Sequence, residues 1–213
     1  MKYQETREKV LEIAVKCAET GLIHGTEGNV SARVPGEDLC VITPSGIPYV
    51  TLKPEDLPVV TLHGEVVEGE HKPSSETPMH TAIFRARPNV NGIVHTHSKY
   101  ATVFSILQKE IPAMVPPSSA FAPVPCAPFQ LPGSEELGES VVNALGTDHL
   151  AVTMQNHGQI AVAPTLDMAY RGAEVVEEVA EIAYLSMRGG SLNPVPEDAV
   201  VELRRRALKG QAV

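Results

Sequence analysis

The pattern that most constrains the fold of this chain is a series of short strand-like segments joined by brief turns. Apolar or alternating runs occupy residues 29–34, 39–42 and 59–62, and Pro and Gly residues separate them. Two more such runs flank the turn at residues 155–158. Connections this short can join only antiparallel neighbours, because parallel strands need a long crossover. The sequence therefore predicts a largely antiparallel sheet.

Helical segments interrupt these strands at irregular intervals. The first spans residues 3–20 and places Val10, Ile13 and Cys17 on one face, with Gly21 where the helix would end. Further helical patterns occupy residues 76–86, 100–109, 134–145, 165–187 and 196–208. We predict an α/β fold of three layers, α/β/α, around a central, mostly antiparallel mixed sheet, in a single domain of residues 1–213.

The stretch at residues 111–133 differs from the rest of the chain because it carries seven prolines. Proline has no backbone N–H and its ring clashes with the preceding helical turn, so this stretch cannot form a regular helix. We predict a long loop that covers another part of the molecule.

The overall composition limits the partners of the protein. Hydrophobic residues make up 43% and charged residues 20% of the chain, which is an ordinary globular balance. The formal charge of −9 opposes binding to nucleic acid or to an anionic membrane. No apolar run approaches the roughly 20 residues that span a bilayer, and the N-terminus is too charged for a secretory signal.

The cysteines predict the compartment. Cys17, Cys40 and Cys126 are widely spaced and include no CxxC pair. Such a set is typical of reduced thiols and not of a disulfide framework. We therefore expect a cytoplasmic protein without disulfides.

The sharpest chemical signal is the tripeptide His95-Thr96-His97, which follows a β-branched run. Alternate residues of an extended segment point to the same side, so both imidazoles can reach one ion. Such a pair alone is more often two ordinary surface or core histidines. His157 favours a metal site, because it lies in a predicted tight turn where a bulky polar ring has little other purpose. Three histidines with one open position are typical of a catalytic metal.

Glu76 lies at a predicted helix start, directly after Ser74 and Ser75. Helix capping alone would explain these residues. However, two serines at a helix N-terminus can also bind an anion, because their hydroxyls and the unpaired N–H groups converge on it. His80 follows one turn later on the face of Glu76, and we interpret it as a packed or hydrogen-bonded histidine.

Two short glycine-containing loops can bind an anion in a similar way. The first reads GTEGN and includes Gly28 and Asn29, and the second reads TPSG and includes Ser45 and Gly46. Their backbone amides and hydroxyls can surround a phosphate. Each loop alone is also ordinary turn chemistry.

Five motifs occur together and in a fixed order. They are GTEGNVS at 25–31, TPSG at 43–46, PSSE at 73–76 followed by His80, HTH at 95–97 and NHG at 156–158. In this combination the chain resembles the class II aldolase/adducin family over essentially its whole length. Unlike its separate parts, the set of five is highly specific.

The resemblance implies a zinc ion bound by His95, His97 and His157, with Glu76 as both a resting-state ligand and the acid/base. Such a metal stabilises the enediolate that forms when a C–C bond breaks, and a carboxylate displaced from the metal can move a proton. The resemblance also implies a homotetramer with active sites between subunits. The implied phosphate pocket consists of Gly28, Asn29, Ser45, Gly46, Ser74 and Ser75.

The implied activity is cleavage of a ketose 1-phosphate, of the fuculose, 5-deoxyribulose or methylthioribulose type, to dihydroxyacetone phosphate and an aldehyde. A rival on the same fold is epimerisation, dehydration or decarboxylation of a related sugar phosphate. A metal-free interaction domain like the adducin head is a further alternative. That alternative predicts lost ligands, whereas the three histidines and Glu76 are all present.

The chain departs from the family pattern at the aldehyde end of the substrate. The family's aldolase carries a tyrosine shortly after the IPA segment, whereas this chain reads IPAMVPPSS from Ile111 and has no tyrosine between Tyr100 and Tyr170. The tail RRRALKGQAV also lacks the aromatic residues that cover the family's site. We therefore expect an aldehyde half that is smaller, different, or protonated by another acid.

Overall fold

An eight-stranded sheet in the order β4-β3-β2-β1-β5-β8-β7-β6 forms the centre of the computed structural model. The structure describes residues 2–209, so Met1 and residues 210–213 of the predicted domain and tail lie outside it. Neighbouring strands are antiparallel except β6 and β7. The strands are β1 Gly28–Arg33, β2 Leu39–Ile42, β3 Val59–Thr61, β4 Val66–Glu68, β5 Gly92–Thr96, β6 Cys126–Ala127, β7 Ala151–Met154 and β8 Gly158–Ala163.

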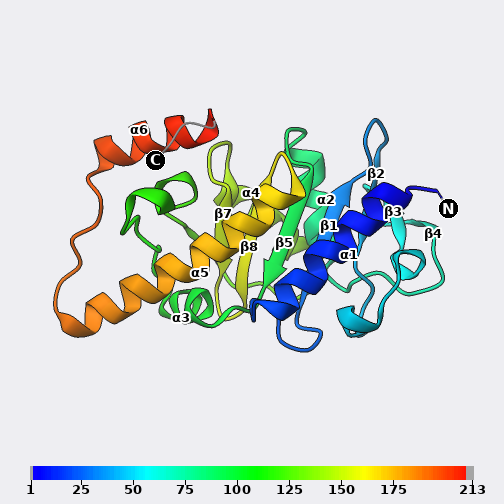
Figure 1. Cartoon of the computed structure of the whole chain (residues 1–213), viewed down its shortest axis with the longest axis horizontal. Helices are drawn as coiled ribbons and strands as arrows, with labels where there is room; N and C mark the ends of the chain where they lie inside the picture. The colour runs from blue at the N-terminus through cyan, green and yellow to red at the C-terminus, as the bar shows by residue number, and fades with distance from the viewer. Residues whose placement is uncertain (1, 210–213) are drawn as a thin grey trace.

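Helices cover both faces of this sheet (Figure 1). The helices are α1 Gln4–Glu19, α2 Thr77–Ala86, α3 Lys99–Leu107, α4 Glu135–Leu145, α5 Leu166–Gly189 and α6 Glu197–Leu208. Apolar residues of α1, α3 and α5 share one buried cluster with one side of the sheet, and those of α2 and α4 share a second cluster with the other side. The predicted three-layer α/β/α fold with a mostly antiparallel mixed sheet is confirmed.

Strand β5 shows how the sequence produces two cores. Val94 belongs to the cluster beneath α1 and α5, whereas its neighbour Ile93 belongs to the cluster beneath α2 and α4. Because side chains alternate along a strand, His95 faces the same side as Ile93 and points toward α2. The same alternation on β1 turns Asn29 and Ser31 toward α2. Polar groups from two neighbouring strands therefore meet the helix that follows Glu76.

Most elements begin and end within a few residues of their predicted bounds, and two helix starts have a clear local cause. Ser134 accepts a hydrogen bond from Leu137 N at 3.1 Å, and Thr165 accepts one from Met168 N at 3.3 Å. These side chains pair backbone N–H groups that a helix start leaves unpaired. The caps therefore fix the first residues of α4 and α5.

Both edge strands, β4 and β6, are absent from the strands predicted from the sequence. β4 has three residues, and β6 has two, which lie between Pro125 and Pro128. The proline-rich stretch at 111–133 otherwise forms loops and a short 3₁₀ turn, Pro116–Ala120, which agrees with the prediction that it contains no regular helix. Within residues 2–209, none of the helices is both long enough and apolar enough to span a membrane.

Candidate active site

Three histidine side chains meet at one end of the central strands. His95 belongs to β5, His97 follows this strand directly, and His157 lies in the turn between β7 and β8. Because β8 pairs with β5, the turn that carries His157 comes beside the end of β5. The ring centroids are 4.8–4.9 Å apart in all three pairs. The structure thus brings the histidines predicted from the sequence around one point, where they could hold a metal ion.

The ring nitrogens and carboxylate oxygens that face one another in this cluster are suited to binding a cation. His95 Nδ1 lies 2.8 Å from the Gln159 carbonyl oxygen and donates to it, so Nε2 of the neutral ring carries a lone pair. Nε2 lies 3.1 Å from His97 Nε2 and 2.9 Å from Glu76 Oε2, with which it forms an ion pair when the ring is protonated. Two nitrogen ligands of a tetrahedral zinc ion are about 3.3 Å apart, because Zn–N bonds are about 2.0–2.1 Å long. A divalent ion would replace these contacts with coordination bonds.

Burial and the Glu76 carboxylate together control the charge of the three imidazoles. Burial, and next the proximity of His95, lowers the pKa of His97 and His157 to about 4. Burial acts in the same direction on His95, but the Glu76 carboxylate outweighs it and raises the pKa of His95. At neutral pH, His97 and His157 are therefore in the neutral form that binds metals.

Glu76 directly precedes α2, and its carboxylate oxygens contact His95 and His157. Its backbone N–H donates to Ser74 Oγ at 3.2 Å, but Glu76 itself is the N-cap residue and no side chain caps α2, so the predicted capping by Ser74 or Ser75 is wrong. Carboxylate oxygen Oε1 lies 3.3 Å from His157 Nε2 but makes no hydrogen bond with the described residues. A buried carboxylate oxygen without a donor is a second feature that a bound cation would satisfy.

The charge of Glu76 follows from two opposing effects. Burial raises the pKa of its carboxyl group, whereas the nearby His95 and His157 and a hydrogen bond from Asn29 lower it. The lowering effects are stronger together, and they hold the pKa well below its usual range. Glu76 is therefore an ionised carboxylate at neutral pH, which is the form required of a metal ligand or a base.

Two glycines allow the backbones around the histidines to pack closely. A Cβ atom on Gly28 would lie 2.7 Å from the His95 carbonyl oxygen, and one on Gly158 would lie 2.4 Å from the Thr96 carbonyl oxygen. Either clash would push a neighbouring strand away from β5. Gly28, which the sequence suggested as a phosphate residue, thus has a packing role as well.

A pocket of about 240 Å³ opens beside the cluster. Ser75 is exposed there, and the N-terminus of α2 begins two residues later. Glu76, His97 and His157 also line this pocket. The six predicted phosphate residues Gly28, Asn29, Ser45, Gly46, Ser74 and Ser75 all line it. Loops far apart in the sequence therefore share one pocket with His97 and His157.

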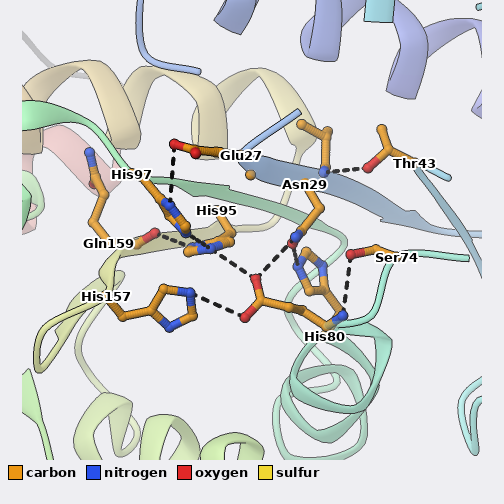
Figure 2. A network of polar contacts seen from close by, with 12 residues as sticks. Glu27, Asn29, Thr43, Ser74, His80, His95, His97, His157 and Gln159 are labelled. Carbon is orange, nitrogen blue, oxygen red and sulfur yellow. Dashed lines mark hydrogen bonds and ion pairs between the residues drawn. The ribbon is translucent and has the colours of Figure 1, made fainter. Parts of the chain in front are cut away.

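Asn29 reaches this pocket, but its side-chain amide is already engaged (Figure 2). Nδ2 donates to Glu76 Oε2 at 3.1 Å, and Oδ1 lies 2.5 Å from His80 Nε2. The other ring nitrogen of His80, Nδ1, lies 2.6 Å from Ser31 Oγ. The expectation that His80 is packed and hydrogen-bonded is therefore met, and the partners of His80 connect it to Glu76.

The hydrogen bond between His95 and Gln159, which orients the His95 ring, was not predicted from the sequence. The Gln159 carbonyl oxygen accepts the Nδ1–H of His95, and the Gln159 side chain donates to Ser98 Oγ at 2.8 Å and to the Ala173 carbonyl oxygen at 3.0 Å. A hydrogen bond of this kind fixes the ring so that Nε2 faces the metal position. No signal in the sequence marks Gln159, because it acts on His95 through a backbone carbonyl.

The buried His80 should make the metal-free protein less stable in acid. Burial lowers the pKa of His80 to about 3, against about 6.5 in the unfolded chain, so only the unfolded chain gains this proton as the pH falls from 7 to 5. The contribution is present above pH 6.5 and decreases below it, by about 2 kcal/mol between pH 7 and pH 5. Urea unfolding of wild type and His80→Gln at both pH values measures it. Between pH 7 and pH 5, the variant should lose about 2 kcal/mol less free energy of unfolding than the wild type. Equal losses in the two proteins would contradict the lowered pKa of His80.

Comparison with known proteins agrees with this geometry. The sequence profile of the class II aldolase and adducin N-terminal domain matches residues 8–184. The chain belongs to the class II aldolase and adducin family. A family member from Bacillus thuringiensis serovar kurstaki, 5-deoxy-D-ribulose 1-phosphate aldolase, is 38% identical over 207 residues, which cover 97% of both chains.

Solved structures of class II aldolase family members have the same fold. An L-fuculose 1-phosphate aldolase superposes with a TM-score of 0.93, at 32% identity and 98% coverage of each chain. A putative aldolase/epimerase/decarboxylase from Klebsiella pneumoniae, YgbL, superposes with a TM-score of 0.86, at 30% identity, with 96% of this chain and 100% of that chain covered. The family depends on a metal, which agrees with the histidine cluster of this chain.

Proposed function

We propose that this protein is a class II, metal-dependent aldehyde-lyase that cleaves a ketose 1-phosphate to dihydroxyacetone phosphate and an aldehyde. The observation that carries the proposal is the arrangement of three imidazoles and one buried carboxylate around a single point beside a pocket. His95, His97 and His157 would hold the ion, with Glu76 as a fourth ligand before substrate binds. A divalent ion there supplies Lewis-acid stabilisation for the negative charge that develops on the substrate oxygens.

Glu76 is the group that moves the proton. In the condensation direction it takes a proton from C3 of dihydroxyacetone phosphate, and in the cleavage direction it returns one to that carbon. Its carboxylate is ionised at neutral pH, and Oε1 has no hydrogen bond within the described residues, so this oxygen is free to accept a proton. Asn29 holds the other oxygen, Oε2, at the same time.

The phosphate group of the substrate binds in the pocket at the start of α2. Ser74, Ser75, Ser45 and Gly46 line this pocket, and the unpaired N–H groups of a helix N-terminus favour an anion. Gly46 has a φ of +72°, and no atom lies within 4 Å of the position a Cβ would occupy, so the loop leaves room for a ligand. The net charge of −9 does not oppose this local site, because the donors are hydroxyl and amide groups beside the bound substrate.

Ser75→Ala is expected to raise KM about tenfold or more with little change in kcat. The Ser75 hydroxyl would donate to a charged phosphate, and such a hydrogen bond is worth about 1.5–3 kcal/mol, but the phosphate changes little while the C–C bond breaks. Inorganic phosphate should compete with the substrate. Ser191→Ala, in the exposed connection between α5 and α6, is the control. A large fall in kcat at unchanged KM would place Ser75 at the reacting carbon instead.

The substrate is a short-chain ketose 1-phosphate, and 5-deoxyribulose 1-phosphate is our first candidate because an aldolase for it is 38% identical to this chain. No tyrosine lies between residues 100 and 170, which supports an aldehyde half unlike that of fuculose. A panel of fuculose, 5-deoxyribulose and methylthioribulose 1-phosphates, with coupled detection of dihydroxyacetone phosphate, tests the proposal. Absence of that product from every substrate would contradict it.

Epimerisation, dehydration or decarboxylation on the same metal site is the second candidate. The missing tyrosine favours it, and the similar protein from Klebsiella pneumoniae is described as a putative aldolase/epimerase/decarboxylase. Each of these reactions leaves a different product from the panel substrates. Product analysis by NMR therefore separates them from aldol cleavage.

Three further features belong to the proposal. The ion is zinc, since three neutral imidazoles and a carboxylate suit it. The protein is a homotetramer with active sites between subunits, as the family resemblance implies. It is cytoplasmic, because Cys17, Cys40 and Cys126 are all free.

A further inference from the structure

We propose that His80 is a positioning residue for Glu76, and that it acts through the side-chain amide of Asn29. This inference rests on the proposed function, because it assigns a task to residues around the same acid/base. Ser31, His80, Asn29 and Glu76 form a continuous hydrogen-bonded chain in which every residue is at most 5% exposed. This hydrogen-bonded chain runs from Ser31 on β1 to His80 on α2, returns to Asn29 on β1 and ends at the Glu76 carboxylate.

The orientation of the Asn29 amide follows from the charge of Glu76. An ionised carboxylate can only accept hydrogen bonds. The end of the amide that lies 3.1 Å from Glu76 Oε2 must therefore be the NH₂ group. The amide oxygen then faces His80 Nε2 at 2.5 Å, so this nitrogen must carry a proton.

The proton on His80 Nε2 fixes the rest of the chain. The ring is fully buried, and both of its nitrogens face uncharged groups, the Asn29 amide and the Ser31 hydroxyl, so the ring is neutral and its other nitrogen, Nδ1, carries a lone pair. The Ser31 hydroxyl, 2.6 Å from Nδ1, must therefore donate to it. With the opposite tautomer, Nε2 would be an acceptor facing the Asn29 oxygen, and the amide would turn its oxygen toward Glu76. His80 thus decides which end of Asn29 meets the carboxylate.

The hydrogen bond from the Asn29 NH₂ group to Glu76 becomes more important when a metal binds. Within residues 2–209, this NH₂ group is the only hydrogen-bond donor to the Glu76 carboxylate that does not belong to the histidine cluster. His95 and His157 also direct Nε2 atoms toward this carboxylate, but a nitrogen that binds a metal cannot donate a hydrogen bond. Asn29 alone would then hold Oε2 while Oε1 takes the proton. The amide therefore serves the acid/base more than the phosphate group.

The test compares variants of the metal-loaded protein by proton exchange at C3 of dihydroxyacetone phosphate in D₂O. His80→Leu removes the donor to Asn29 and should lower the maximal exchange rate about 10- to 100-fold at unchanged KM and metal content. His80→Gln should recover most of the rate, because its amide can donate to Asn29. Thr81→Val is the matched control, since Thr81 is buried in the same helix and its side-chain hydroxyl donates to the Pro78 carbonyl oxygen, outside the hydrogen-bonded chain.

A double-mutant cycle separates positioning from general stability. If His80 acts through Asn29, then His80→Leu should change the exchange rate less than about twofold in an Asn29→Ala background. Additive effects, or a His80→Leu rate equal to that of Thr81→Val, would overturn the proposal. Where His80→Leu does not fold, Ser31→Ala takes its place, because it removes the donor to His80 Nδ1.

A second readout does not depend on activity. In ¹⁵N NMR spectra of the protein with and without zinc, His80 should show a protonated Nε2 and an unprotonated Nδ1. The opposite tautomer would overturn the proposal. If wild-type protein gives no exchange, the proposed function fails, and the NMR spectrum still decides the tautomer on which the positioning depends.

Discussion

Glu76→Gln is expected to lower kcat for cleavage of the ketose 1-phosphate by about 10²–10⁴-fold, with the protein still folded and still binding metal. Glutamine keeps the size of the side chain and one oxygen, but it cannot take a proton. The three imidazoles remain, so the ion stays bound. The coupled assay for dihydroxyacetone phosphate measures the rate, and elemental analysis measures the metal.

The competing explanation makes Glu76 only a charge at the N-terminus of α2. Such a charge is worth about 0.3–1 kcal/mol of stability and nothing in catalysis. Glu135→Gln is the matched control, because Glu135 lies in the first turn of α4. If the two variants retain similar activity, the role of Glu76 as the acid/base is wrong.

His157→Ala should remove most of the bound metal and nearly all activity. A site with three histidine ligands cannot hold an ion in an open geometry after losing one of them. His157 is a better choice than the fully buried His95, because it lies in a turn and its removal disturbs the core less. Elemental analysis and activity after dialysis are the measurements.

His149→Ala serves as the control for this variant. His149 is partly buried, follows α4, and does not belong to the histidine cluster. Its contact with Arg87 uses the backbone oxygen, which alanine keeps. One metal ion per chain and full turnover in His157→Ala would refute the ligand assignment.

The histidine cluster could be predicted from the sequence because its geometry is mostly local. His95 and His97 are two residues apart next to a strand, so the period of the strand puts both rings on one side. The third histidine, His157, was predicted because a tight turn is an unusual place for a bulky polar ring. The antiparallel pairing of β5 with β8 then completes the site.

The tasks of Asn29 and His80 could not be predicted in the same way. Both residues agree with simpler local explanations, a loop that binds phosphate and a packed helix residue. Their connection to Glu76 depends on the distance between β1 and α2, which no local pattern contains. The requirement for Gly158 is similar, since it arises from the close approach of the Thr96 carbonyl oxygen on the neighbouring strand.

The edge strands show the corresponding limit for the fold. β6 has only two residues, and the three residues of β4 are exposed or half-exposed at the sheet edge, so neither segment carries an apolar pattern that marks a strand. They pair with the neighbouring strands β3 and β7, whose free backbone N–H and C=O groups hydrogen-bond to them. The longer central strands carry enough alternation to be recognised from the sequence alone.

Proton exchange at C3 of dihydroxyacetone phosphate is the most direct test of the central claim, because it needs the metal and the base but no aldehyde. In D₂O, NMR should show the wild-type protein replacing one C3 hydrogen with deuterium. The zinc-free protein and Glu76→Gln should leave the signal unchanged. Equal exchange by wild type and Glu76→Gln would assign the base to another residue, and no exchange by the zinc-loaded wild type would contradict the aldolase function.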